Sequence, residues 1–356
     1  MPGWGFGSLF SGWNGLARFW ICLVALLAIC GATLQILGPP QHSPPPRPVA
    51  DARPPPQPQP AAPAPAPLAS QVPPAQRPGR STPGPIADPD PALLEPMAGS
   101  TTDLLPRIAD DGRMPMQVYA AGFDGTSRRP RVGLLIAGIG LSQSDSEAAI
   151  HSLPGGVTLA FSPYAQSPAK LLDDARLAEH EYLLSIPMEP QGFPLNDPGP
   201  QALMTSASPE QNHARLDWAL SRMRGYVGVT GALGAGLLGE RFASLPDELQ
   251  PLLADLAHRG LLYVDPRQNA ASLPLAWNRS VDLVIDTPDD AAAIDDKLAQ
   301  LSRLAHTRFI ALGLATAPRP VTIQRIAAWA DGLTADRLAL APVSALVKPP
   351  AKGTGQ

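Results

Sequence analysis

Apolar and polar positions alternate in blocks along the second half of the chain, from about residue 131 onward. The first block, residues 132–139, is an almost continuous apolar run. Its bulky members are Val132, Leu134, Leu135, Ile136 and Ile139. Such a run is typical of a parallel strand that is covered on both faces. Ser144 and Glu147 form a capping-box pattern, so a helix is predicted directly after this strand.

Similar short apolar runs follow, separated by segments with helical spacing. The predicted strands are residues 157–161, 182–186, 226–229, 261–264, 281–285, 309–314 and 338–340. The predicted helices are residues 168–179, 208–223, 249–256, 294–301 and 323–330. Alternation of this kind predicts an α/β fold with a parallel sheet wrapped by helices. We expect a compact or incomplete (β/α)7–8 barrel, with an open doubly wound sheet as the alternative.

The region before the first strand has a different composition. Of the 45 prolines, 22 lie between Pro39 and Pro96. Residues 39–129 carry too few bulky apolar side chains to offset the entropy of ordering them. They are therefore predicted to be a disordered proline-rich linker between the N-terminal segment and a folded domain at residues 130–348, and residues 349–356 are predicted to be a disordered tail. Docking of this linker into a proline-binding groove is the alternative to a spacer role.

Residues 19–37 contain no charged side chain. At 1.5 Å per residue a helix of this length spans about 28 Å, enough to cross a bilayer. With Arg18 as the positive flank, the positive-inside rule predicts residues 1–18 in the cytoplasm, a transmembrane helix at residues 19–38, and an exported remainder. The predicted location is a single-pass position in a bacterial inner membrane, with the folded domain in the periplasm. A cleaved signal peptide and a lipoprotein signal ending at Cys30 are the alternatives.

Charge and cysteine content exclude several classes of function. The formal net charge of −4 gives no indication of a nucleic-acid partner. Both cysteines, Cys22 and Cys30, lie in the predicted span, so the expected domain has neither a disulfide nor a thiolate metal site. Gly138 and Gly140 resemble half of a dinucleotide-binding fingerprint, but Gln143 replaces the third glycine and a tight turn is the preferred interpretation.

Several loops together resemble one family, the divergent polysaccharide deacetylases of bacterial envelopes, over residues 131–347. The most specific segment is the loop Ile186-Pro187-Met188-Glu189-Pro190. The others, in chain order, are Val157-Thr158-Leu159-Ala160-Phe161 with Pro163-Tyr164, Pro198-Gly199-Pro200, Val227-Gly228-Val229, Leu262-Tyr263-Val264-Asp265 with Arg267 and Ser272, and Asp286.

The resemblance implies a barrel in which an Asp-Asp pair after the first strand and histidines from later loops hold a divalent metal. That metal would activate a water for attack on an acetamide. The Asp-Asp pair corresponds here to Ala137 and Gly138, the fourth-loop ligand segment to Thr230–Ala232, and the last one to Thr316 and its neighbours. We therefore expect no cofactor, with zinc or another divalent metal only if other residues replace the lost ligands.

Replacement ligands are not evident among the remaining polar residues. The five histidines of the predicted domain, His151, His180, His213, His258 and His306, all fall in or beside predicted helices. The carboxylates at strand ends are Glu189, Asp265 and Asp286. A carboxylate pair could hydrolyse a glycoside, but pairing of Asp265 with Arg267 and bracing of a loop by Glu189 are the preferred interpretations. The candidate glycan-binding cleft consists of Tyr164, Glu189, Asp265, Arg267 and Asp286.

Three functions follow from this sequence. The preferred one is a membrane-tethered pseudoenzyme that binds glycan or acts as a scaffold in the envelope. The second is an active carbohydrate deacetylase with unusual ligands. The third is recruitment of wall-processing proteins by the domain and its tether.

Overall fold

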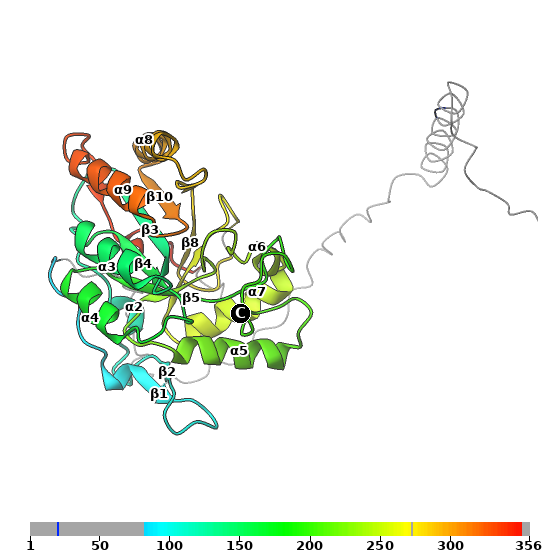
Figure 1. The fold of residues 1–356 in the computed structure, drawn as a ribbon. Helices are drawn as coiled ribbons and strands as arrows, with labels where there is room; N and C mark the ends of the chain where they lie inside the picture. The colour runs from blue at the N-terminus through cyan, green and yellow to red at the C-terminus, as the bar shows by residue number, and fades with distance from the viewer. Residues whose placement is uncertain (1–19, 21–81, 272, 351–356) are drawn as a thin grey trace, which may run out of the picture. The chain divides into compact units, whose positions relative to one another are not determined.

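A curled parallel sheet surrounded by helices forms the centre of the folded region (Figure 1). The structure, a computed structural model, describes Trp20, residues 82–271 and residues 273–350. The sheet strands are β3 (Arg131–Ile139), β4 (Thr158–Phe161), β5 (Tyr182–Ser185), β6 (Gly228–Thr230), β7 (Leu262–Asp265), β8 (Asn278–Ser280), β9 (Leu283–Val284), β10 (Ile310–Ala315) and β11 (Ala339–Leu340).

The helices alternate with these strands, as predicted. They are α3 (Gln143–Ser152), α4 (Ala169–Leu177), α5 (Pro209–Ser221), α6 (Glu240–Ala243), α7 (Pro246–His258), α8 (Ala291–Arg308) and α9 (Pro320–Gly332). A short 3-10 helix, η2 (Val343–Ala345), follows the last strand. The expected α/β class is confirmed.

Strand order excludes the doubly wound alternative. The order is β8-β7-β6-β5-β4-β3-β10-β9, so neighbours in space are largely neighbours in sequence, and every ladder in this sheet is parallel. Residues 278–285 join the two edges: the Val281 amide donates to the Asp265 carbonyl of β7, and the Ile285 amide donates to the Leu314 carbonyl of β10. The sheet is therefore curled like a barrel, with its strand ends gathered at one mouth.

The single strand predicted at residues 281–285 is wrong. Two short strands, β8 and β9, replace it, because the segment changes partner from β7 to β10 between them. Asp282 lies at the change-over, and its carboxylate accepts from the Leu312 amide at 2.8 Å. A local apolar run cannot reveal a change of partner, which depends on both sheet edges.

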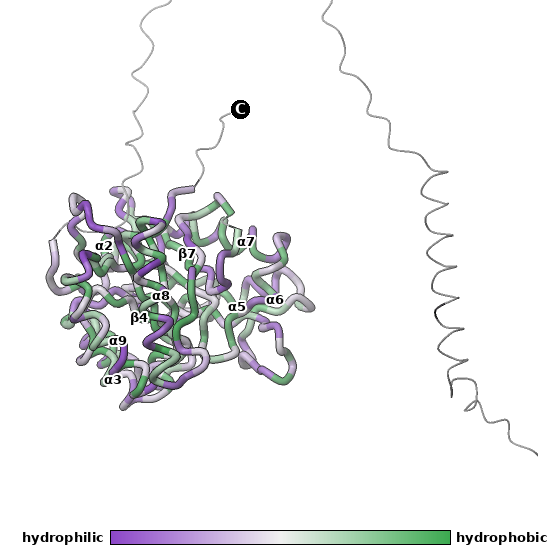
Figure 2. The backbone as a smooth tube through the Cα atoms, turned by 90° about the horizontal axis from the view of Figure 1, so that it is seen from above, coloured by the Kyte–Doolittle hydropathy of each residue, from purple (hydrophilic) through white to green (hydrophobic). Residues whose placement is uncertain are grey.

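Side chains of each strand alternate between two cores. Leu134 and Ile136 belong to the layer between sheet and helices, whereas Leu135 and Ala137 belong to the barrel interior. All four are fully buried. Figure 2 shows the hydrophobic stretches gathered in the strands at the centre. This two-sided burial explains why the strands read as continuous apolar runs.

Two helix starts test the capping predictions. At α5 the expected capping box is confirmed: Ser208 accepts from the Gln211 amide, and the Gln211 side chain accepts from the Ser208 amide. At α3 the predicted cap at Ser144 is wrong. Ser142 is the N-cap and accepts from the Asp145 amide, because β3 ends at Ile139 and the following turn leaves Ser142 in an extended conformation.

The predicted linker is too long by about fifty residues, since residues 82–129 are folded against the domain. They contain η1 (Pro91–Leu93), the antiparallel hairpin β1 (Leu94–Pro96) and β2 (Leu104–Pro106), and the short helix α2 (Pro115–Val118). Their few large side chains are widely spaced but buried: Ile86, Leu93, Leu105, Met116 and Tyr119. The barrel supplies the apolar surface that this segment lacks, which its average composition could not show.

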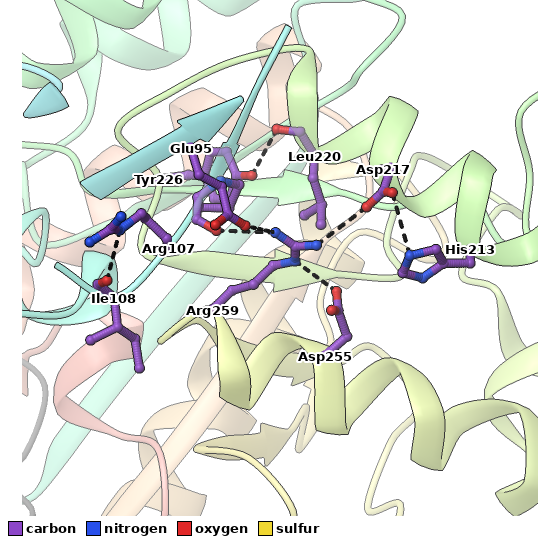
Figure 3. Close-up of polar contacts among 10 residues, drawn as sticks. Glu95, Arg107, Ile108, His213, Asp217, Leu220, Tyr226, Asp255 and Arg259 are labelled. Atoms are coloured by element: carbon purple, nitrogen blue, oxygen red, sulfur yellow. Dashed lines mark hydrogen bonds and ion pairs between the residues drawn. The ribbon is translucent and has the colours of Figure 1, made fainter. Parts of the chain in front are cut away.

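Arg259 fixes the hairpin to the barrel (Figure 3). Its guanidinium donates to Asp255 on α7 at 2.9 Å, to Glu95 on β1 at 3.1 Å and to the Pro106 carbonyl on β2 at 3.3 Å. Asp217 on α5 lies 3.4 Å from the same guanidinium. Burial raises the pKa of Asp217. One cation thus connects three separate parts of the chain.

A buried carboxylate closes the other end of the barrel. Glu181 precedes β5 and is fully buried. It accepts from the Ala121 amide at 3.0 Å, the Thr158 hydroxyl at 3.1 Å, and the Ser344 amide and hydroxyl at 2.9 and 2.6 Å. Burial raises the pKa of Glu181. Residues of the N-terminal segment and of the C-terminal 3-10 turn therefore both donate to the side chain of Glu181, which directly precedes β5.

The predicted transmembrane helix, residues 19–38, lies outside the described residues apart from Trp20. Among the residues that the structure does describe, no helix has the length and apolar character needed to cross a bilayer.

Candidate functional site

The mouth of the barrel begins at Ala137 and Gly138, where β3 ends. Ala137 is fully buried and belongs to the barrel interior. Gly138 has a φ of +77°, at a register shift in the β3–β4 ladder. A Cβ at Gly138 would lie 3.6 Å from the Thr316 carbonyl oxygen. The first and last of the positions that the family resemblance assigns to metal ligands are thus neighbours, because β3 and β10 are adjacent in the sheet.

Asp286 occupies this part of the mouth, and three donor groups of the loop after β10 bind its carboxylate. Its carboxylate accepts from the Thr316 amide at 2.8 and 2.9 Å, from the Thr316 hydroxyl at 3.0 Å and from the Ala317 amide at 3.1 Å. Asp286 is 2% exposed and Thr316 4%. A carboxylate held in this way stabilises the loop after β10 and has no free face toward solvent.

The fourth loop is filled by apolar packing. Thr230 and Ala232 are fully buried, and the Thr230 hydroxyl accepts from the Ala232 amide at 3.3 Å. A Cβ at the intervening Gly231 would lie 3.4 Å from Met188 Sδ and 3.5 Å from Pro266 Cγ. Met188, from the Pro-Met-Glu-Pro loop, therefore fills the space beside the segment where a histidine is expected from the resemblance.

Asp265 and Arg267 pair with each other, which confirms the preferred interpretation of these residues. Arg267 Nη2 lies 2.6 Å from Asp265 Oδ2, and Nε lies 3.0 Å from Oδ1. The hydrogen bonds that Arg267 donates to the Asp265 carboxylate raise the pKa of Arg267. Asp265 lies with Tyr263 beside Leu249 and Leu253 of α7, on the outer side of the sheet. This pair holds the loop after β7 and faces away from the barrel interior.

Glu189 braces its loop, also as preferred from the sequence. One carboxylate oxygen accepts from the Thr205 amide and from its hydroxyl, both at 2.7 Å. The other lies 3.2 Å from Arg241 Nε. Glu189 is 3% exposed, whereas the Arg241 side chain is half exposed. The carboxylate thus joins the loop after β5 to α6.

Tyr164 supports a turn rather than presenting a free ring. Its hydroxyl accepts from the Gln201 amide at 3.3 Å, and its ring centroid lies 5.5 Å from that of Trp218. Burial raises the pKa of Tyr164. A Cβ at Gly199, whose φ is +93°, would come within 2.7 Å of the tyrosine oxygen. The candidate cleft residues other than Asp286 therefore form three separate sets of contacts: Tyr164 with Gln201, Glu189 with Thr205, and Asp265 with Arg267.

Sequence reasoning missed the hydroxyl groups at the same strand ends. Ser185 pairs in register with Thr230 on the neighbouring strand, and both are fully buried. The Ser185 hydroxyl has no hydrogen-bond partner among the described residues. A serine ending a buried strand was the available signal. Without a histidine beside it, this hydroxyl remains a weak nucleophile.

The histidines lie where the sequence places them, away from the strand ends. His151, His213, His258 and His306 are on α3, α5, α7 and α8. His180 is fully buried before β5, with its ring nitrogens 2.8 Å from the Val157 carbonyl and 3.1 Å from the Ile150 carbonyl. Burial lowers the pKa of His180. None of the five reaches the mouth.

A divalent metal does not fit the residues at the mouth. Ala137, Gly138 and Ala232 offer no donor side chain, and Thr316 already bonds to Asp286. Within residues 82–271 and 273–350, no three His, Cys, Asp or Glu side chains gather in a way that could hold an ion. Zinc prefers four ligands of these types, arranged tetrahedrally. The donor set needed for metal-activated water is therefore not assembled here.

Comparison with known proteins identifies what this fold is similar to. A family model described as divergent polysaccharide deacetylase matches residues 134–347. Among solved structures, an uncharacterized protein from Agrobacterium tumefaciens C58 is 34% identical, with a TM-score of 0.64, and the match covers 69% of this chain and all of that one. No curated protein matches the chain.

Proposed function

The chain belongs to the divergent polysaccharide deacetylase family, and from that premise we propose that it is a non-catalytic member that binds envelope glycan or acts as a scaffold there. One observation carries the proposal. The positions that correspond to the family's metal ligands carry Ala137, Gly138, Ala232 and Thr316, and each strand-end carboxylate, Glu189, Asp265 or Asp286, is hydrogen-bonded to its own separate partners. Packed and internally hydrogen-bonded side chains thus stand at the positions where a hydrolase of this family would have its metal ligands.

Burial strengthens this argument, because a hydrolase must admit substrate to its reactive atoms. Ala137, Ser162, Ser185, Thr230 and Ala232 are all fully buried at the strand ends. Met188 is 1% exposed and lies against Gly231 and Gly239. An acetamide carbonyl would have to displace these side chains before reaching the barrel interior.

Two measurements test the absence of catalysis. The full chain is titrated with zinc by isothermal calorimetry, and its hydrolysis of a chromogenic acetylated sugar is followed with zinc present. An active polysaccharide deacetylase, measured in parallel, is the positive control. We expect neither specific zinc binding nor turnover. Micromolar zinc binding together with turnover would overturn the proposal.

The alternative is an active deacetylase whose ligands are Glu189, Asp265 and Asp286. The separate hydrogen-bond partners of these residues disfavour it. If this alternative held, Asp265→Ala would abolish turnover while the domain remained folded. Turnover that is unchanged in Asp265→Ala would remove that residue from any mechanism.

We further propose that residues 19–38 anchor the protein in a bacterial inner membrane and that the folded domain lies in the periplasm. The uncharged segment, the Arg18 flank and the proline-rich residues after it support this placement. Alkaline extraction of membranes from cells expressing the full chain tests the anchor. Release of the protein into the soluble fraction would contradict it.

Recruitment of wall-processing proteins by the tether is a separate proposal. Since residues 82–129 are folded, the variant that tests it should lack residues 39–81 only. Affinity capture with the full chain and with this variant would show partners that depend on the tether. Identical sets of captured proteins would assign recruitment to the domain instead.

A further inference from the structure

The helical side of the fold has a groove that offers a place for the glycan. We propose that a neutral oligosaccharide binds between α8 and α9, outside the barrel; this inference rests on the proposed glycan-binding function. The two helices lie side by side in Figure 1. Between them is a cavity of about 480 Å³, a size in the range of small-molecule sites.

Small residues create the groove. Ala299 on α8 and Ala328 on α9 are both exposed and both line it. Leu298 and Ser302 form buried parts of its wall. The small side chains of these alanines leave space between the two helices that larger residues would fill.

An aromatic ring with a fixed orientation lines this groove. The Trp329 indole N–H donates to the Ser302 hydroxyl at 2.9 Å. Trp329 is half-buried, and it packs partly against the core. An indole face held in this way is suited to the apolar face of a sugar ring, and it costs little conformational entropy on binding.

Polar groups around the ring supply both donors and acceptors. Arg325 and Asp295 form a two-point ion pair across the helices, with Nε 2.6 Å from Oδ1. Arg303, His306 and Asp336 also line the groove, and the side chains of these three have no hydrogen bond or ion pair with the described residues. They are therefore available to hydroxyl or amide groups of a ligand.

The balance of charge indicates the class of ligand. Arg325 is neutralised by Asp295, and the unpaired Arg303 is matched by the unpaired Asp336. An anionic or a cationic ligand would meet one like charge, whereas an uncharged polyhydroxylated chain can use both groups. The cavity between α5 and α7 is smaller, about 140 Å³, and its acidic rim over an apolar floor suits a sugar less well.

A blocking variant tests the groove without removing any packing. Ala299→Arg places a long side chain in the channel, and Gln300→Arg, at the next exposed residue of α8 outside the groove, is the matched control. The full chain in detergent is titrated with chitotetraose by calorimetry. We expect at least a tenfold loss of affinity in Ala299→Arg, none in Gln300→Arg, and a several-fold loss in Asp336→Ala.

The outcomes distinguish failure of the groove as the binding site from failure of the glycan-binding function. If Ala299→Arg binds chitotetraose as well as the wild type does, or if Gln300→Arg loses as much, the groove is not the site although glycan binding stands. Tighter binding of a tetragalacturonate than of chitotetraose would overturn the neutral ligand class. If the wild type binds neither saccharide, the glycan-binding function itself fails.

Discussion

Thr316 and Asp286 are joined by both the backbone amide and the hydroxyl of the threonine, at 2.8 and 3.0 Å from the same carboxylate oxygen. The pair connects the residue directly after β10 with the second residue after β9. At the place where the family resemblance expects a histidine ligand, this chain has a hydroxyl that serves an internal carboxylate. The position has a structural role in place of a chemical one.

Asp286→Ala should therefore destabilise the domain. It leaves the buried Thr316 amide and the partly buried Ala317 amide without an acceptor, which we expect to cost about 3 kcal/mol in the free energy of unfolding. Urea denaturation measures the loss. Asp289→Ala is the control, because Asp289 is mostly exposed and forms an ion pair with Arg319 at 3.2 Å. This substitution should change the free energy of unfolding by less than about 0.5 kcal/mol. Equal effects of both variants would contradict the assigned role of Asp286.

Restoring an acid at the first ligand position should harm this protein. Ala137→Asp puts a carboxylate into the barrel interior, where residue 137 is fully buried and has apolar neighbours. An unpaired buried charge costs several kcal/mol, so we expect a large drop in the melting temperature. Ala292→Asp, in the exposed first turn of α8, should leave the melting temperature almost unchanged. A stable Ala137→Asp protein would show that the mouth is more open than proposed.

The buried Glu181 should make stability depend on pH. Its pKa is raised in the folded state above the ordinary value of 4.5. Its contribution is therefore fully present below about pH 4.5 and is lost as pH rises through the higher folded pKa. Glu181→Gln removes this titration. As pH falls from 8 to 4, the unfolding free energy of the wild type should rise relative to that of Glu181→Gln. A difference that stays constant over this range would refute the assignment.

At neutral pH, Glu181→Gln should also be destabilising. The backbone amides of Ala121 and Ser344 donate to different carboxylate oxygens. A glutamine therefore places its own NH₂ group against one of them in either orientation. We expect a cost of about 1–3 kcal/mol, measured by urea denaturation at pH 7.

Arg259→Ala should loosen the N-terminal hairpin without unfolding the barrel. It removes the donors to Glu95 and to the Pro106 carbonyl that connect β1 and β2 to α7. Hydrogen exchange should show faster exchange in the hairpin, for example at the Met97 amide, which donates to the Asp103 carbonyl. Arg319→Ala, at an exposed ion pair, is the control. Unchanged hairpin exchange in Arg259→Ala would mean that apolar packing alone holds the hairpin.

The amino-acid sequence by itself determined the α/β class and the absence of donor side chains at Ala137, Gly138 and Ala232, whereas the strand order came from the structure. The first two properties are local: a buried parallel strand needs a run of apolar residues, and alanine or glycine cannot ligate an ion wherever it lies. The Asp265–Arg267 pair was also accessible, because a single residue, Pro266, separates its members in sequence.

Only the tertiary structure decided which surfaces bury the remaining residues. Residues 82–129 fold because the barrel supplies apolar surface and Glu181 supplies a hydrogen-bond acceptor, and Asp286 accepts a hydrogen bond from the Thr316 amide thirty residues away. The groove beside Trp329 depends likewise on how α8 packs against α9. Contacts between residues distant in sequence are set by the packing of whole elements, so composition and periodicity along the chain carry no record of them.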